Sequence, residues 1–221
     1  MTTAEVKIPA GEATLDGNLS VPDGATTILV LFAHGSGSSR HSPRNQFVAR
    51  TLNDSGLATL LFDLLTREEE ATDIYTRQYR FDIGLLAERL VYATKWSKTQ
   101  PATRELRIGY FGSSTGGGGA LVAAAELPDD VDAVVSRGGR PDLAGDALPK
   151  VRAATLLIVG GNDDVVIDLN EQAREKMRCE VKIEIVPGAT HLFEEPGALE
   201  RVAQLAADWF VQHTPESLHL S

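Results

Sequence analysis

Cysteine is almost absent from this 221-residue sequence, which contains only Cys179. A single cysteine forms no disulfide within the chain, and no cluster of Cys and His residues has the spacing of a metal site. The fold must therefore be held together by a hydrophobic core, for which a hydrophobic content of 43% is sufficient. We expect neither a metal nor a cofactor.

Long apolar runs and basic clusters are also missing. No run approaches the roughly 18 apolar residues that a membrane-spanning helix needs, and residues 1–7 lack the pattern of a secretion signal. Acidic side chains outnumber basic ones by 31 to 21, which gives a formal net charge of -10. This charge disfavours a nucleic-acid or acidic-membrane partner. We therefore expect a cytoplasmic protein whose partner is a small molecule.

Short buried runs alternate with amphipathic runs along the chain. After an N-terminal hairpin formed by 6–8 and 13–21, we expect strands at 27–33, 58–62, 106–111, 131–135, 155–159 and 181–186. The expected helices are 45–53, 81–98, 120–127, 169–177 and 199–213. This alternation predicts an α/β fold with a mainly parallel central sheet and helices on both faces. We expect one domain, 1–221, and the short interval 136–154 leaves no room for a large cap.

The pattern Gly-x-Ser-x-Gly occurs once between a predicted strand and a predicted helix, with Ser114 at its centre. Such a strand, turn and helix form a nucleophile elbow, in which a strained backbone pushes the serine hydroxyl out of the sheet. Glycine at 112 and 116 allows strand and helix to pass closely. The alternative is that Ser114 is only the N-cap of a helix.

A serine hydroxyl needs a base that takes its proton and an acid that orients this base. Asp163 follows one predicted strand, and His191 follows the next. The chain order Ser114, Asp163, His191 is the order expected of an α/β-hydrolase triad. Asp164 is an alternative acid, and either aspartate could instead only cap a turn.

The other four histidines fit the base less well. His34 and His41 precede the serine, whereas His213 and His219 lie in a polar C-terminal segment where we expect them to be solvated.

The segment His34-Gly35-Ser36-Gly37 ends the first buried strand and predicts an oxyanion hole. Acyl transfer builds negative charge on a carbonyl oxygen, and each preorganised backbone N–H lowers the barrier by roughly 3 kcal/mol. We expect Ser36 and Thr115 to supply these N–H groups, and His34 is a candidate substrate-binding residue. The alternatives are a loop without a catalytic role and a nucleotide-binding loop, although the third glycine of the dinucleotide pattern is missing and no Gly-Lys-Ser/Thr run exists.

At these positions the chain resembles the α/β-hydrolase superfamily, and within it the small, cap-less dienelactone hydrolase family. The resemblance spans nearly the whole chain and rests on 34–37, 62–65, the elbow around Ser114, 160–166 and 188–191. It implies that Ser114 is the nucleophile, Asp163 the orienting acid and His191 the general base. The dienelactone hydrolases that name the family use a cysteine nucleophile. The serine found here therefore favours a carboxylesterase whose partner is a small ester or lactone substrate.

Other functions use the same groups. A small peptidase or thioesterase would need the same nucleophile, base and oxyanion hole. A non-catalytic α/β-hydrolase-fold protein that binds a ligand or a partner is a second class, because a fold alone does not establish activity. Such proteins usually lack a member of the triad, and here all three positions are filled.

Arg137 and Arg140 follow the strand after the elbow helix, so we expect them at the edge of the site. A guanidinium group there would bind a substrate carboxylate, as the anionic substrates of dienelactone hydrolases suggest. In the alternative, the two arginines pair with Asp142, Asp168 or Asp63 and only hold the loop.

Overall fold

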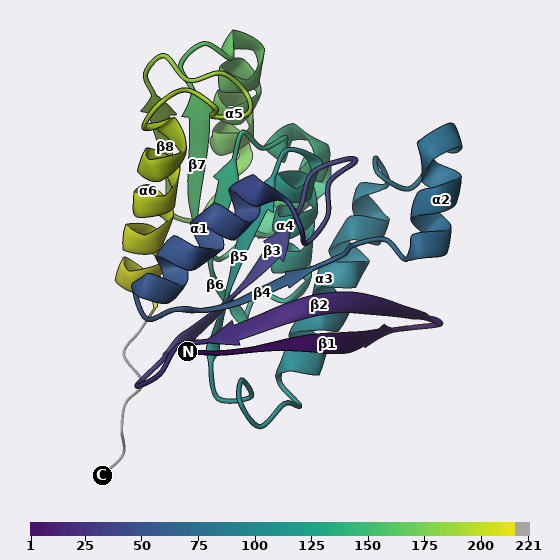
Figure 1. Cartoon of the computed structure of the whole chain (residues 1–221). Helices are drawn as coiled ribbons and strands as arrows, with labels where there is room; N and C mark the ends of the chain where they lie inside the picture. The colour runs from purple at the N-terminus through teal and green to yellow at the C-terminus, as the bar shows by residue number, and fades with distance from the viewer. Residues whose placement is uncertain (215–221) are drawn as a thin grey trace.

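One sheet of eight strands forms the centre of the molecule, which is a computed structural model that describes residues 1–214. The strand order is β1-β2-β4-β3-β5-β6-β7-β8, and the neighbours from β4 to β8 are parallel (Figure 1). The hairpin β1–β2 and the pair β2–β4 are antiparallel. The strands are β1 (Thr2–Ala10), β2 (Ala13–Val21), β3 (Ile28–Ala33), β4 (Ala58–Phe62), β5 (Arg107–Ser113), β6 (Val131–Arg137), β7 (Ala154–Gly160) and β8 (Val181–Val186). The expected mainly parallel sheet is confirmed.

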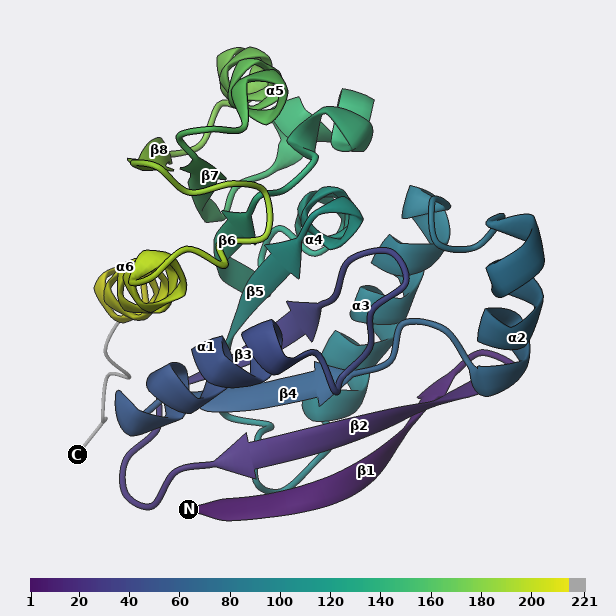
Figure 2. The ribbon, with the colours of Figure 1, turned by 45° about the horizontal axis from the view of Figure 1, so that its top comes forward.

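Helices cover both faces of the sheet, as Figure 2 shows. The helices α1 (Pro43–Asp54) and α6 (Ala198–Gln212) pack on one face. The helices α3 (Ile83–Ser97), α4 (Thr115–Glu126) and α5 (Asp164–Lys176) pack on the other. Side chains alternate along β3, so that Leu29 and Leu31 enter one core while Val30 and Phe32 enter the other. The molecule has the α/β-hydrolase fold.

The connection between β6 and β7 is short, as expected, and carries no cap domain. It forms 3-10 turns over Pro141–Lys150 that are interrupted at Gly145. Because no cap covers it, the edge of the sheet formed by the carboxyl ends of the parallel strands is left open. In the part of the chain that the structure describes, no helix combines the length and the apolar character needed to cross a membrane.

Three helices differ from the sequence-based expectation. Helix α4 begins at Thr115 and not at 120, and helix α5 begins at Asp164 and not at 169. The residues that open these two helices have weak helix propensity: they are four buried glycines in α4 and three β-branched residues in α5, of which Val166 is buried. Helix α2 (Arg67–Thr76) was not expected, since it has no apolar stripe. Its signal is a capping box, in which Thr66 accepts from the Glu69 N–H and Glu69 accepts from the Thr66 N–H.

The expected solvation of His213 is wrong. Its ring lies 3.9 Å from the Trp209 ring, its Nδ1 lies 2.9 Å from the Trp209 carbonyl oxygen, and its side chain is 11% exposed. The histidine follows α6 directly, where a helix leaves carbonyl groups without intrahelical partners. His219 lies outside the described residues.

Candidate active site

The carboxyl ends of the parallel strands bring the predicted site residues to one edge of the sheet. Ser114 follows β5, Asp163 follows β7 and His191 follows β8. This edge is where chemistry collects in open α/β sheets. A cleft of about 220 Å³ there is lined by Ser114 and His191, together with Ser36 and Arg137.

Ser114 occupies the sharp turn between β5 and α4. Its φ of 51° and ψ of -123° lie in a region that residues with side chains rarely adopt. A side chain on Gly112 would place its Cβ 2.6 Å from the Gly116 oxygen, and one on Gly116 would place it 2.2 Å from the Ala33 oxygen. Both glycines are therefore required for the close approach of strand and helix. Ser114 makes no side-chain capping bond to α4, so the N-cap alternative does not describe it.

Backbone hydrogen bonds connect this turn to the end of β6 and to the loop that follows it. The Ser114 N–H donates to the Arg137 carbonyl at 3.3 Å, and the Arg140 N–H donates to the Ser114 carbonyl at 3.0 Å. Asn170 of α5 is fully buried and donates to the Gly139 carbonyl at 3.1 Å. The elbow, the loop after β6 and α5 thus form one connected unit.

His191 and Asp163 are in direct contact. The distance between His191 Nδ1 and Asp163 Oδ2 is 2.7 Å, and the side chain of Asp163 is only 17% exposed. Asp164 is exposed in the first turn of α5. Of the two aspartates, Asp163 is therefore the one in position to orient the ring, and its bond to Nδ1 leaves Nε2 free of this carboxylate.

Ser36 and Thr115, the expected oxyanion donors, lie next to each other. Their side-chain oxygens are 2.9 Å apart, and Ser36 Oγ donates to the Arg80 carbonyl at 3.1 Å. Since the Ser36 hydroxyl hydrogen is used by Arg80, the Thr115 hydroxyl donates to Ser36. These bonds bring together the loop after β3 and the first residue of α4.

His34 does not have the expected substrate-binding geometry. It is 7% exposed, its Nε2 accepts from the Leu64 N–H at 3.0 Å, and its Nδ1 donates to the Gly35 carbonyl at 3.0 Å. Burial lowers the pKa of His34, so the ring stays neutral. Because both nitrogens are bonded to the backbone, His34 joins the loops after β3 and β4 and has no polar atom left for a substrate.

The two candidate arginines behave differently. Arg140 forms two hydrogen bonds of 2.8 Å to Asp142, which agrees with the alternative that it holds the loop and corrects its assignment to substrate binding. Arg137 pairs with none of the three expected aspartates, lines the cleft and is only 7% exposed. The structure therefore keeps Arg137, but not Arg140, available for the site.

Residues near the start of α1 also lie at the cleft, although no local sequence pattern predicted this. Arg44 lines it, and Asn45 accepts from Ser113 Oγ at 3.1 Å. Asn45 Oδ1 also lies 3.5 Å from Arg137 Nη2. The helix begins at the carboxyl edge of the sheet because Ser42 caps it and Pro43 opens it, both of which are ordinary helix-start signals.

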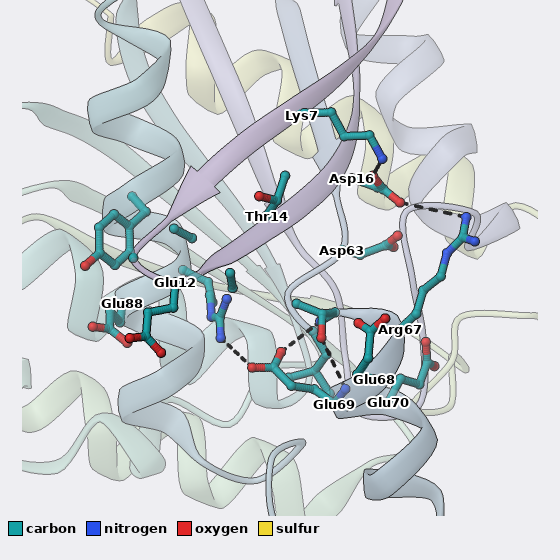
Figure 3. A pocket seen from close by; sticks show the side chains of 17 residues that line it. Lys7, Glu12, Thr14, Asp16, Asp63, Arg67, Glu68, Glu69, Glu70 and Glu88 are labelled. Carbon is teal, nitrogen blue, oxygen red and sulfur yellow. Dashed lines mark hydrogen bonds and ion pairs between the residues drawn. The ribbon is translucent and has the colours of Figure 1, made fainter.

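A larger hollow lies elsewhere, between the β1–β2 hairpin, α3 and the start of α2 (Figure 3). Its volume is about 1050 Å³, and carboxylates such as Glu12, Glu68 and Glu88 surround it. Within residues 1–214 no group of three His, Cys, Asp or Glu side chains has the arrangement of a metal site. The hollow holds none of Ser114, Asp163 or His191, so the smaller cleft carries the predicted chemistry.

Solved structures with low sequence identity share this fold. A structure from Xanthomonas campestris, described as an α/β serine hydrolase without a lid, superimposes with a TM-score of 0.77 at 19% identity, covering 97% of this chain and 96% of that one. The structure of Est1E from Butyrivibrio proteoclasticus gives a TM-score of 0.78 at 18% identity, covering 95% and 98%. At these identities the likeness concerns the fold.

Residues 15–214 match the model of the dienelactone hydrolase family, and the chain belongs to that family. The crystal structure of a dienelactone hydrolase from Anabaena variabilis is 61% identical, with a TM-score of 0.94 and coverage of 97% of this chain and 99% of that one. Family and fold together support an enzyme of the hydrolase type.

Two curated relatives from Mycobacterium tuberculosis strains are named putative phosphoribosyl transferase. Each is 58% identical over 209 residues, which is 95% of this chain but 46% of the relative. The chain thus spans less than half the length of these relatives.

Proposed function

We propose that this chain is a serine hydrolase that cleaves small esters or lactones through a covalent acyl-enzyme. The observation that carries the proposal is the meeting of three residues at one open edge: Ser114 on its positive-φ turn, and His191 held by Asp163 at 2.7 Å. A cleft of about 220 Å³ favours a small substrate, because sites for drug-sized molecules measure about 300–1,000 Å³.

In the proposed first step, His191 Nε2 takes the proton of Ser114 Oγ while this oxygen attacks the ester carbonyl. The backbone N–H groups of Ser36 and Thr115 bind the developing oxyanion. Asp163 keeps the Nδ1 proton in place and stabilises the imidazolium that forms. When the carbonyl is restored, His191 returns the proton to the departing alcohol oxygen. A water molecule then repeats the sequence on the acyl-enzyme and releases the acid.

The same groups would act on a thioester or a small peptide, so the substrate class needs a direct comparison. The transferase name of the mycobacterial relatives belongs to proteins of which this chain covers less than half. Phosphoribosyl transfer is therefore not part of the proposal for this chain. A non-catalytic binding protein is the remaining alternative from a different class.

The test combines active-site labelling with a substrate panel. We expect a fluorophosphonate probe to label the wild type and the control Ser55→Ala, whose serine lies at the far end of α1, but not Ser114→Ala. Hydrolysis of p-nitrophenyl esters graded by acyl length should fall by about 10⁴ to 10⁶ in kcat in Ser114→Ala. A lactone, a thioester and a dipeptide amide complete the panel. A folded Ser114→Ala protein that keeps a tenth of the activity would rule out the serine mechanism.

A further inference from the structure

One wall of the cleft carries two arginines from different elements. Arg137 is the last residue of β6, and Arg44 lies in the first turn of α1. Both line the cleft that also contains Ser114 and His191. The wall is therefore positively charged next to the predicted nucleophile.

Arg137 is buried without a carboxylate partner. Among the described residues, its Nε and Nη1 atoms have no hydrogen-bond partner, and its Nη2 is 3.5 Å from the neutral amide oxygen of Asn45. Burial lowers the pKa of Arg137 to about 10, and the nearby Arg44 contributes in the same direction. A buried charge without a counter-charge destabilises a folded protein. The buried charge of Arg137 thus destabilises the free protein, and a bound anion would compensate this charge.

Further donors surround the same space. The Nε atom of Arg44 is buried and, within residues 1–214, has no partner, while its Nη1 contacts Glu194 at 3.1 Å. Glu194 is 66% exposed, so this ion pair is solvated and weak. Ser38 and Ser42 also line the cleft, and Ser42 caps the N-terminus of α1. A helix N-terminus carries a partial positive charge that favours anions.

We propose that Arg137 and Arg44 bind a phosphate group carried by the substrate. A phosphate dianion fits this wall better than a carboxylate, because it can neutralise two guanidinium groups and offers three oxygens to the surrounding donors. Because the arginines line the same cleft as Ser114 and His191, the proposed substrate carries the phosphate and the scissile carbonyl in one small molecule. The hydrolysis of such a compound rests on the proposed function, whereas the binding of phosphate does not.

The binding test uses inorganic phosphate above pH 7.5, where the dianion predominates. A ³¹P NMR titration should show binding to the wild type, and Arg137→Met should weaken it at least tenfold. The matched control is Arg152→Met, which removes an exposed arginine paired with Asp129 at the opposite edge of the sheet and should leave binding unchanged. Arg137→Met should also raise the melting temperature, since it removes an unpaired buried charge. Absence of phosphate binding to the wild type, or equal binding to Arg137→Met, would overturn the proposal.

A substrate series then measures specificity. Three p-nitrophenyl esters differ only at the end of the acyl chain, which is a phosphate, a carboxylate or a methyl group. We expect the wild type to favour the phosphate ester at least tenfold in kcat/KM, and Arg137→Met to abolish this preference mainly through KM. Preference for the carboxylate ester would contradict the phosphate assignment. Equal losses on all three esters, with a lower melting temperature, would make Arg137 a structural residue. Hydrolysis of the methyl-ended ester without phosphate binding would leave the proposed function intact and refute this inference alone.

Discussion

Asp163 and Asp164 carry the same side chain one residue apart, and their surroundings separate them. Asp163 is largely buried and contacts His191 Nδ1, whereas Asp164 begins α5 and is exposed. A carboxylate at Nδ1 fixes the tautomer in which Nε2 can accept a proton. The loop offers two acids, but only one has the geometry of an orienting group.

This difference gives a prediction at the scale of one residue. Asp163→Asn should lower kcat for ester hydrolysis by about 10⁴, because the amide favours the wrong imidazole tautomer. Asp164→Asn should change kcat by less than about tenfold, since its side chain does not contact the ring. Steady-state kinetics on a short-chain p-nitrophenyl ester measures both. The reverse ranking would transfer the orienting role to Asp164.

Arg137 and Arg140 show how a neighbouring side chain decides the role of a residue. Arg140 has Asp142 two residues away and pairs with it, whereas Arg137, at the end of β6, reaches Asn45 of α1 and lines the same cleft as Arg44. Two arginines three residues apart thus become a structural ion pair and a candidate anion ligand. The deciding contacts come from a helix that is distant in the sequence.

At the scale of elements, hydrogen bonds connect α2 to the loop after β3 that carries Ser36. Asp73 in α2 is nearly fully buried, accepts from the Tyr79 N–H at 2.7 Å and from the Arg80 N–H at 3.2 Å, and pairs with the Arg80 side chain. The Arg80 carbonyl in turn accepts from Ser36 Oγ. A helix that projects from the sheet in Figures 1 and 2 is thereby linked to a predicted oxyanion donor.

The Asp73–Arg80 pair predicts a pH-dependent stability. Burial alone would raise the pKa of Asp73, but hydrogen bonds from Arg80 and Tyr79 outweigh it and hold the pKa below its ordinary value. The stabilisation is complete above the unfolded-state pKa of about 3.9 and is lost as pH falls through the lower folded-state pKa. At pH 7, Asp73→Asn should therefore reduce the free energy of unfolding by about 3 kcal/mol.

Urea unfolding at a series of pH values measures this effect. The difference between wild type and Asp73→Asn should shrink as pH falls below 4, where the carboxylate of the wild type becomes protonated. Asp129→Asn, which alters an aspartate that is 83% exposed, should stay within about 0.5 kcal/mol of the wild type throughout. A gap that is constant with pH would show that the charge of Asp73 is not the stabilising feature.

At the scale of the whole molecule, one sheet links two hydrophobic cores. Alternate residues of β3 and β5 enter opposite cores, as Tyr110 and Phe111 do in β5. Loss of either core would expose one side of the same central strands. The two layers of helices therefore depend on each other for stability.

This arrangement predicts a single cooperative unfolding transition for the chain. Scanning calorimetry should give one peak in which the calorimetric and van't Hoff enthalpies agree, as expected of one domain. Two separable peaks would show that the hairpin or one helical layer unfolds independently, and would contradict the expectation of one domain. The measurement is best made with the Ser114→Ala variant, which keeps the core and excludes covalent modification of the serine.

The elements that the sequence alone predicted are those with a strong local pattern. The strands β4, which is buried along its whole length, and β8, which is only partly buried, appear with the expected bounds, and the elbow lies where the glycine and serine spacing placed it. Helix α2 was missed because an exposed helix has little apolar periodicity, and the starts of α4 and α5 were missed because glycine and β-branched residues have weak helix propensity. The sequence predicts a strand or a helix when burial of one of its faces imposes a regular spacing of apolar residues.

The sequence by itself determined the alternation of strands and helices apart from α2, the turn that carries Ser114 and the chain order of Ser114, Asp163 and His191. These features follow from the spacing of apolar residues and glycines over a few neighbouring positions. Only the tertiary structure decided that both His34 nitrogens bind backbone and that Arg44 lies beside Arg137. The reason is that a hydrogen bond or ion pair depends on distances of a few ångströms between segments far apart in the chain. Such distances are set by how helices and strands pack, not by any local pattern.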